Sequence, residues 1–162
     1  MKRKLLVITG TPGVGKSTLA KKIAKYLHFN RLDLHRYYKK LAIGYNYKKR
    51  CYDLDFKKLI TFIENKKRKS PQGLILDSHL AHLLPRKTID LCLVLVCSNL
   101  KELRTRLQKR KYSQQKIREN LDAEIFQVCL IEAKERRHKV MIIDTSVALP
   151  WKQLYRKISK SL

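Results

Sequence analysis

Acidic residues are scarce in this chain of 162 residues. It holds 13 Asp and Glu against 38 Lys and Arg, which gives a formal net charge of +25. The excess is spread over basic segments at residues 48–51, 64–70, 106–112, 133–139 and 154–160. An enzyme for a small free substrate does not need this much positive charge. The balance therefore favours a polyanionic neighbour, most commonly nucleic acid, although a lysine-rich proteome would give the same composition.

Long apolar runs are also missing. The longest lies around residues 89–97 and is far too short to span a bilayer. The first ten residues have a basic end and few apolar residues, which predicts a first strand rather than a signal peptide. Hydrophobic residues make up 44% of the chain, enough for one core. We therefore expect a single domain over residues 1–162, with no membrane association.

Cysteine is infrequent and shows no C-x-x-C pair. The four cysteines are Cys51, Cys92, Cys97 and Cys129. Because Cys92 and Cys97 lie in an apolar run, we expect them to act as small core residues rather than as metal ligands. This usage indicates a reducing compartment, the cytoplasm, or the nucleus if the organism is eukaryotic.

Glycine is rare as well, yet three of the five glycines are Gly10, Gly13 and Gly15. They belong to the stretch ITGTPGVGKST, which has the Gly-x-x-x-x-Gly-Lys-Ser spacing of a phosphate-binding loop. In such a loop, backbone N–H groups and a helix N-terminus bind phosphate oxygens. Lys16 reaches the β- and γ-phosphates, and the Ser17 hydroxyl ligates Mg²⁺. A glycine-rich hairpin turn would explain neither Lys16 nor Ser17.

The residues on either side of the loop agree with that interpretation. Residues 4–9 form a short apolar run, as a buried strand requires. After the loop, Leu19, Ile23 and Leu27 recur at helical spacing.

Strand and helix patterns alternate along the rest of the chain. Further strands are predicted at residues 30–34, 74–77, 89–97 and 140–143. Helices are predicted at residues 55–66, with Asp55 at the N-terminus, then at 99–109, at 113–137 and from Pro150 onward. This alternation predicts a three-layer α/β fold with a parallel sheet and ligands at the carboxyl ends of the strands.

The third predicted strand ends in Asp77, beside the expected position of the phosphate loop. A carboxylate there holds Mg²⁺ or its waters, as in a Walker B motif; an Asp that caps a turn is the alternative. His79 can orient an attacking water or contact the γ-phosphate. His82 follows three residues later, but an H-x-x-H zinc site has no evident third ligand.

A basic segment at residues 107–116 separates two predicted helices. Arginines that close over a nucleotide from a mobile segment stabilise the charge of a transferring phosphoryl group. Arg106 and Arg110 therefore predict a lid at about residues 109–118, unless the segment is only a solvated basic loop.

Residues 33–54 are rich in Tyr, Arg and Lys and form the expected acceptor-binding segment. Aromatic side chains in such a segment stack on a base, and basic groups hold its phosphate. The same residues can bind single-stranded RNA. Alternatively, buried tyrosines pack a small helical subdomain.

Three motifs taken together resemble the adenylate kinase isoenzyme 6 family: GTPGVGKST, LILDSH and EIFQV at residues 124–128. These are small P-loop kinases, also described as ribosome-assembly ATPases, and the resemblance covers nearly the whole chain. It implies a P-loop NTPase of the nucleoside monophosphate kinase type, for which we expect a five-stranded parallel sheet in the order 2-3-1-4-5. It implies ATP binding through Gly13, Val14, Gly15, Lys16, Ser17 and Thr18.

The resemblance also assigns residues outside the loop. Asp77 and His79 match the family's modified Walker B motif, with Ser17 and Asp77 as the metal ligands. Arg106 and Arg110 match the lid arginines of R-L-x-x-R-G-Y, where this chain reads RLQKRKY. Lys111 replaces the glycine of that motif, which predicts a stiffer hinge.

The acceptor segment departs further from the family. Asp33, Arg36 and Lys39 are its candidate acceptor ligands. Lys39 stands where an arginine would hold the acceptor phosphate, and a lysine cannot offer the same bidentate fork. His35 and Arg36 replace a Gly-Asp pair.

The resemblance implies transfer of the γ-phosphoryl group of Mg-ATP to AMP, or to water. It further implies a role in maturation of the small ribosomal subunit, with a ribosomal protein and pre-rRNA as partners. Two alternatives remain open: an assembly factor in which ATP hydrolysis is a conformational switch, and a kinase for another small acceptor.

Overall fold

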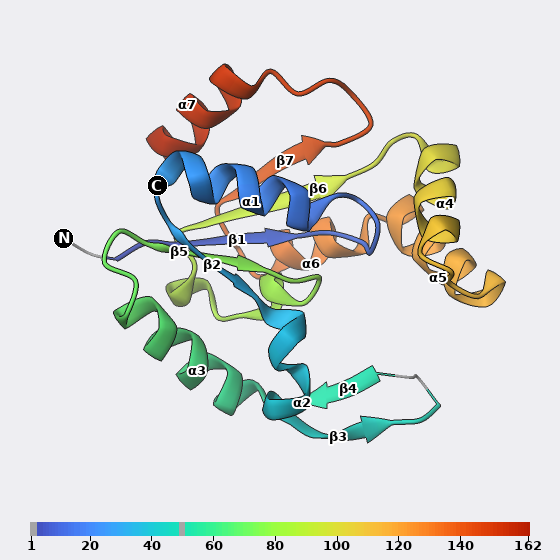
Figure 1. Cartoon of the computed structure of the whole chain (residues 1–162), viewed down its shortest axis with the longest axis horizontal. Helices are drawn as coiled ribbons and strands as arrows, with labels where there is room; N and C mark the ends of the chain where they lie inside the picture. The colour runs from blue at the N-terminus through green and yellow to red at the C-terminus, as the bar shows by residue number, and fades with distance from the viewer. Residues whose placement is uncertain (1–2, 49–50) are drawn as a thin grey trace.

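The computed structural model describes residues 3–48 and 51–162. A parallel five-stranded sheet forms its middle layer (Figure 1). The strands are β1 (Leu5–Thr9), β2 (Asn30–Asp33), β5 (Leu74–Asp77), β6 (Leu91–Val96) and β7 (Val140–Asp144). They lie in the order β2-β5-β1-β6-β7. Counted along the chain, these five strands have the order 2-3-1-4-5, so the prediction is confirmed.

Helices cover both faces of the sheet. On one face, α1 (Lys16–Leu27) and α7 (Trp151–Ser161) pack against side chains such as Leu6 and Ile8. On the other face, α3 (Phe56–Arg68) and α6 (Val128–Glu135) pack against Leu5 and Val7. Because successive strand residues point to opposite faces and both faces are covered, β1 is apolar up to its last residue, Thr9. All five of its residues are buried.

Most helix boundaries follow the capping residues in the sequence. Asp55 caps α3, where its side chain accepts a hydrogen bond from the backbone N–H of Lys58 at 3.1 Å. Asn99 caps α4 (Leu100–Lys109) through the N–H of Glu102. Pro150 precedes α7.

The prediction of one helix over residues 113–137 is wrong. The segment forms two helices, α5 (Gln114–Ile125) and α6. Between them Gln127 adopts the left-handed conformation with φ 49°, which interrupts a right-handed helix. The break redirects the chain so that Leu130 and Ala133 of α6 are buried beneath the sheet. A tertiary contact therefore overrides a helical pattern that runs through the break.

The expected acceptor segment contains a β-hairpin that the sequence analysis did not predict. After β2 come two short helices, η1 (Leu34–Tyr37) and α2 (Tyr38–Leu41), and then β3 (Ala42–Asn46) and β4 (Cys51–Leu54). The two strands pair antiparallel and stand away from the main sheet (Figure 1). Two further short helices, η2 (Ala81–Leu83) and η3 (Arg86–Thr88), follow β5. In the described part of the chain no helix is long and apolar enough to cross a membrane.

The turn between α4 and α5 offers a test of strain at the expected lid. Lys111 has φ 58°, a left-handed conformation that a Cβ atom disfavours by about 1 kcal/mol. We expect Lys111→Gly to raise the free energy of unfolding by up to about 1 kcal/mol, measured by urea denaturation. Lys109→Gly, at the end of α4, is the control and is expected to destabilise. A less stable Lys111→Gly protein would contradict the assignment of strain.

Candidate active site

The phosphate loop connects β1 to α1 at the carboxyl edge of the sheet. Gly15 immediately precedes α1 with φ 99° and, as a glycine, brings no side chain to cap the helix. The first N–H groups of α1 are thus not used by the helix itself and can bind an anion. Gly13, with φ 93°, lies against α4, where an added Cβ would meet Leu103 and Leu107 at 3.0 Å. Geometry therefore favours glycine at both positions; Gly15 is the second glycine of the motif, whereas Gly13 stands at one of its variable positions.

The back of the loop is held by two side chains. The Thr145 hydroxyl donates to the carbonyl of Val14 at 2.7 Å. Arg106 donates to the carbonyl of Gly13 at 3.5 Å and also forms an ion pair with Glu102. Arg106 thus contacts the phosphate loop; its role as a lid arginine stays a prediction. Thr145 follows β7 and was not identified from the sequence, because no local motif surrounds it.

Lys16 folds over the phosphate loop. Its Nζ donates to the carbonyls of Gly10 at 2.7 Å and Thr11 at 2.9 Å. Burial lowers the pKa of this ammonium to about 8, and the positive charge of Arg110 acts in the same direction. Lys16 and the expected lid arginine are therefore close enough to interact, although Arg110 itself is exposed at the end of α4. Ser17 and Thr18 are exposed in the first turn of α1.

Asp77 ends β5 and is 3% exposed. Its Oδ2 accepts a hydrogen bond from Nη2 of Arg31 at 2.6 Å. The same nitrogen lies 3.6 Å from the carboxylate of Asp33. The parallel register places Asp33 directly beside Asp77, so Arg31 joins the ends of two neighbouring strands. Sequence reasoning missed Arg31 as a partner of Asp77, because only the pairing of β2 with β5 reveals this contact.

Replacing Arg31 should leave the buried carboxylate of Asp77 without the positive charge that it pairs with at 2.6 Å. An unpaired buried charge costs about 3 kcal/mol or more, so we expect Arg31→Met to lower the free energy of unfolding by about that amount. The double variant Arg31→Met/Asp77→Asn should recover most of the loss, because the charge is then gone. Urea denaturation of both variants measures this coupling. Equal stability of Arg31→Met and the unmodified protein would show that the ion pair contributes nothing.

His79 lies two residues beyond Asp77, in contact with the acceptor segment. Its Nδ1 is 3.4 Å from the Tyr38 hydroxyl, which is also hydrogen-bonded to Ser78 at 2.8 Å. Burial, together with the positive charge of Lys16, lowers the pKa of His79 to about 4. His79 is therefore neutral at pH 7. A neutral imidazole can accept a hydrogen bond from water but brings no charge to a phosphate.

His82 points to a different part of the molecule. It is hydrogen-bonded to the Thr9 hydroxyl at 2.7 Å and to Glu132 of α6 at 2.7 Å. Its backbone carbonyl is 2.7 Å from Nε2 of His138. Burial lowers the pKa values of both histidines. The network connects the end of β1 with α6, which gives His82 a structural role in the fold.

The candidate acceptor residues gather at the end of β2. Asp33 accepts a hydrogen bond from the backbone N–H of His35 and pairs with Arg36 at 3.8 Å. Arg36 and Lys39 are exposed. Of the tyrosines in the segment, Tyr38 is 8% exposed, whereas Tyr47 is 83% exposed. The segment thus combines a buried tyrosine at its base with exposed rings on the hairpin.

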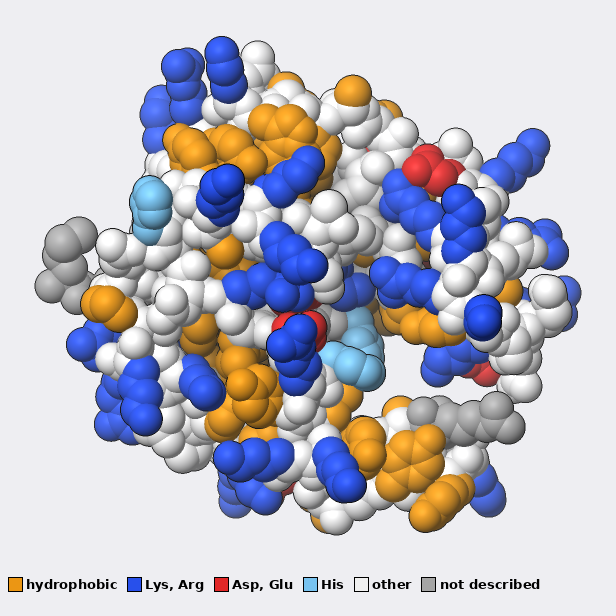
Figure 2. Space-filling model, in the orientation of Figure 1, with side chains coloured by type: hydrophobic (Ala, Val, Ile, Leu, Met, Phe, Trp, Pro, Cys, Tyr) orange, Lys and Arg blue, Asp and Glu red, His pale blue; other side chains and the backbone are white. Residues whose placement is uncertain are grey.

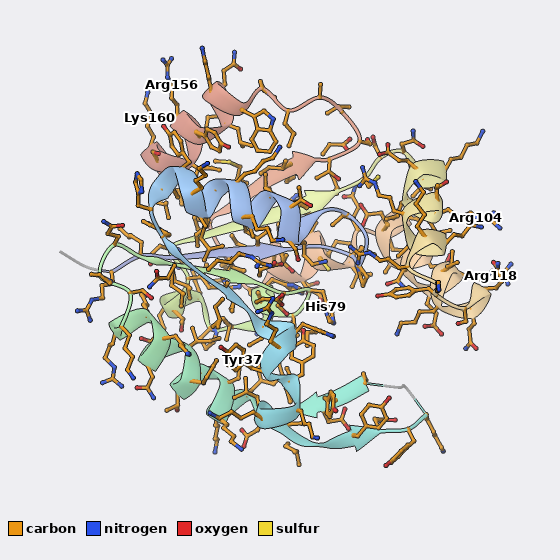
Figure 3. All side chains as sticks on the ribbon, in the orientation of Figure 1. Tyr37, His79, Arg104, Arg118, Arg156 and Lys160 are labelled. Atoms are coloured by element: carbon orange, nitrogen blue, oxygen red, sulfur yellow. The ribbon has the colours of Figure 1, made fainter. Side chains whose placement is uncertain are left out.

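An open hollow separates the α4–α5 region from the β3–β4 hairpin (Figure 2). Histidine side chains lie at its inner end in that view, and Figure 3 places His79 there. The phosphate loop, Asp77 and the acceptor segment therefore converge on one side of the sheet edge. This arrangement can hold a nucleotide triphosphate on the loop and a second substrate beside the hairpin.

Comparisons with known proteins agree with this geometry. A family model described as an AAA domain matches residues 6–127. An adenylate kinase isoenzyme 6 homolog of Schizosaccharomyces pombe is 37% identical over 86% of this chain and 79% of its own length. A putative adenylate kinase of Pyrococcus furiosus is 37% identical over 90% and 77%. One of Methanocaldococcus jannaschii is 40% identical over 87% and 76%.

A solved structure shares the fold. The deoxyadenosine kinase from M. mycoides with bound dATP superposes with a TM-score of 0.57, covering 97% of this chain and 100% of that one. At 15% sequence identity, this likeness establishes the fold alone.

Proposed function

Because the chain belongs to the adenylate kinase isoenzyme 6 family, it is a nucleoside monophosphate kinase of the P-loop type, and we propose that it transfers the γ-phosphoryl group of Mg-ATP to AMP. The observation that carries the proposal is the convergence of the phosphate loop, the buried Asp77 and the acceptor segment on one open hollow. In the transfer, an oxygen of the AMP phosphate bonds to the γ-phosphorus while the bond to the β-phosphate oxygen breaks. ATP loses the phosphoryl group and AMP gains it, so both nucleotides become ADP.

ATP binds the loop through the backbone N–H groups of residues 13–18. Lys16 leaves the carbonyls of Gly10 and Thr11 to reach the β- and γ-phosphates, so its ammonium exchanges neutral acceptors for charged ones. Arg110, and Arg106 at the loop, stabilise the negative charge that spreads over the transferring group. Catalysis then consists of positioning and charge neutralisation, without a covalent enzyme intermediate.

The residues present fit Mg²⁺. Asp77 and Ser17 are hard oxygen donors of the kind this ion prefers. Arg31 occupies Oδ2 of Asp77, and the carboxylate has a second oxygen to offer. When bound with ATP, the ion neutralises charge on the β- and γ-phosphates.

The acceptor phosphate is bound by Arg36 and Lys39. Both side chains are exposed in the acceptor segment, before the β3–β4 hairpin, where a substrate can reach them from solution. Asp33 holds Arg36 at 3.8 Å and thereby limits its orientations. A lysine at position 39 offers a point charge rather than a fork, which favours weaker binding of the acceptor phosphate than an arginine would give.

Selection of the acceptor tests this assignment. We propose that AMP accelerates ADP formation from Mg-ATP more than CMP, UMP or GMP does. The rates are measured with each nucleotide titrated at saturating Mg-ATP. Stronger acceleration by a different nucleoside monophosphate would support kinase activity and identify that nucleotide, rather than AMP, as the acceptor.

His79 separates transfer to AMP from transfer to water. A neutral imidazole beside the phosphate loop can orient a water, so we expect His79→Ala to reduce ATP hydrolysis at least about 10-fold and AMP phosphorylation much less. Both rates are read from one preparation by phosphate release and by ADP formation. His35→Asn, at an exposed histidine of the acceptor segment, controls for loss of a nearby imidazole. Equal losses in both reactions would assign His79 a general role in binding phosphate.

We further propose that the protein acts in maturation of the small ribosomal subunit, in contact with pre-rRNA and a ribosomal protein. The net charge of +25 and membership of the family support this. A second candidate function is an ATP-driven assembly switch with little kinase activity. It is favoured by the substitution of Lys39 for an arginine at the acceptor site.

A further inference from the structure

α1 and α7 lie side by side on one face of the sheet (Figure 1). Exposed cations cover the surface they share: Lys21, Lys22 and Lys25 in α1, and Lys152, Arg156, Lys157 and Lys160 in α7. Neither helix contains an acidic residue. We refer to these seven residues as the basic face. Carboxylates of its own helices do not balance this charge, which favours binding of an external polyanion.

A ladder of aromatic rings runs through the basic face. Tyr26 stacks on Tyr155 with ring centroids 4.1 Å apart and planes 11° from parallel. Tyr155 contacts Trp151 at 5.6 Å, and Nζ of Lys22 lies 4.1 Å from the centre of the Trp151 ring. Lys22 thus covers one end of the ladder. Tyr26 forms the other end and remains 46% exposed, which leaves ring surface available to a further planar group.

The figures show how these groups are arranged. In Figure 2, apolar surface over α1 and α7 is framed by lysine and arginine side chains. Figure 3 shows Arg156 and Lys160 projecting outward from α7, on the opposite side of α1 from His79. Ten residues of helix separate Lys16 from Tyr26, a rise of about 15 Å. The basic face is therefore distinct from the nucleotide site, although α1 contributes to both.

We propose that the basic face binds single-stranded RNA, with phosphates on its lysines and arginine and one base stacked on Tyr26. The proposal rests on the association with RNA proposed above and assigns it to α1 and α7. Lysines and arginines that neutralise phosphates gain affinity for the backbone by counterion release. An exposed aromatic ring adds base stacking without sequence preference. A duplex offers no free base for Tyr26, and an acidic protein would use the cations but not the ring.

Salt dependence tests the contribution of the cations. A fluorescein-labelled single-stranded RNA of about 12 nucleotides, a length within the usual range of such sites, is titrated with the full chain at several salt concentrations. The triple variant Lys152→Glu/Arg156→Glu/Lys160→Glu should lower the slope of log affinity against log salt by about 2, since each lost contact removes about 0.7. ATP turnover should be unchanged.

A matched variant carries the same change of charge on other helices. Lys57→Glu/Lys58→Glu/Lys101→Glu alters exposed lysines of α3 and α4 and should leave most of the slope in place. If both triple variants lose the same slope, RNA responds to net charge alone and the assignment to the basic face is overturned.

Tyr26 tests the stacking step. Tyr26→Leu keeps an apolar side chain against Tyr155 but removes the ring, and we expect RNA affinity to fall about 5- to 150-fold. Tyr26→Phe keeps the ring and should bind like the unmodified protein. Equal affinity of all three proteins would contradict base stacking at this position.

Other polyanions complete the test. Double-stranded RNA of equal charge, poly-glutamate and vesicles containing anionic lipid should each bind more weakly than the single strand and should not respond to Tyr26→Leu. Tighter binding of any of these than of the single strand would identify that polyanion, rather than single-stranded RNA, as the partner of the basic face. If the unmodified protein binds no RNA, the proposed association with RNA fails as well. If it binds RNA but no variant in α1 or α7 alters binding, only this surface assignment fails.

Discussion

Lys16→Met is expected to abolish phosphoryl transfer while leaving the protein folded. The ammonium is the point charge that the loop offers to the β- and γ-phosphates, and loss of one such group costs about 10²–10³-fold or more in rate. Its Nζ donates to two carbonyls of its own loop, at 2.7 and 2.9 Å. The methionine is of similar length, so we expect the free energy of unfolding to change by only about 1 kcal/mol.

The measurement is the rate of ADP formation at saturating Mg-ATP, alongside urea denaturation. Lys21→Met, an exposed lysine of the same helix, is the control and should retain full activity. Turnover near that of the unmodified protein in Lys16→Met would mean that the loop does not catalyse the reaction.

Asp77→Asn is expected to have the second-largest effect. The amide keeps the shape of the carboxylate but loses the negative charge that metal binding requires and with which Arg31 pairs. Turnover should fall by about 10²-fold or more, and more Mg²⁺ should be needed for half-maximal activity. Binding of ATP without metal should change little. Because Arg31 also loses its 2.6 Å partner, a stability measurement must accompany the kinetics.

Calorimetric titration with ATP, in the presence of Mg²⁺ and of a chelator, separates the two effects. Asp33→Asn alters the other carboxylate near Arg31 and serves as the comparison for general electrostatic change. An Asp77→Asn protein that loses metal-free ATP binding as strongly as turnover would argue for a structural role of this carboxylate.

The sequence predicts the sheet and the phosphate loop well because both depend on local patterns. The apolar run that forms β1, the glycines before α1 and the capping Asp55 each specify their structure within a few residues. The predicted order of the strands and the predicted helix start at Asp55 are confirmed by the sheet topology and by the capping hydrogen bond at 3.1 Å. Cys92 and Cys97 are buried in the core, as the apolar run around them indicates.

The missed features depend on contacts between distant segments. Arg31 reads as one more basic residue until β2 pairs with β5 and brings it to Asp77, 46 residues away. The β3–β4 hairpin is stabilised by a cross-strand contact between Tyr45 and Tyr52, with ring centroids 5.1 Å apart, which no local period reveals. The break at Gln127 is set by the burial of α6. In each case the local structure depends on a contact with a distant segment, and the local sequence shows only one of the two residues or elements in that contact.

The destination of the γ-phosphoryl group tests the central claim most directly. Purified protein is supplied with γ-labelled ATP, Mg²⁺ and increasing AMP, and the label is separated into ADP and inorganic phosphate. A nucleoside monophosphate kinase that accepts AMP predicts that the label passes into ADP in proportion to AMP occupancy and that phosphate release declines. Release of the label as phosphate at a constant rate, at every AMP concentration, would contradict phosphoryl transfer to AMP.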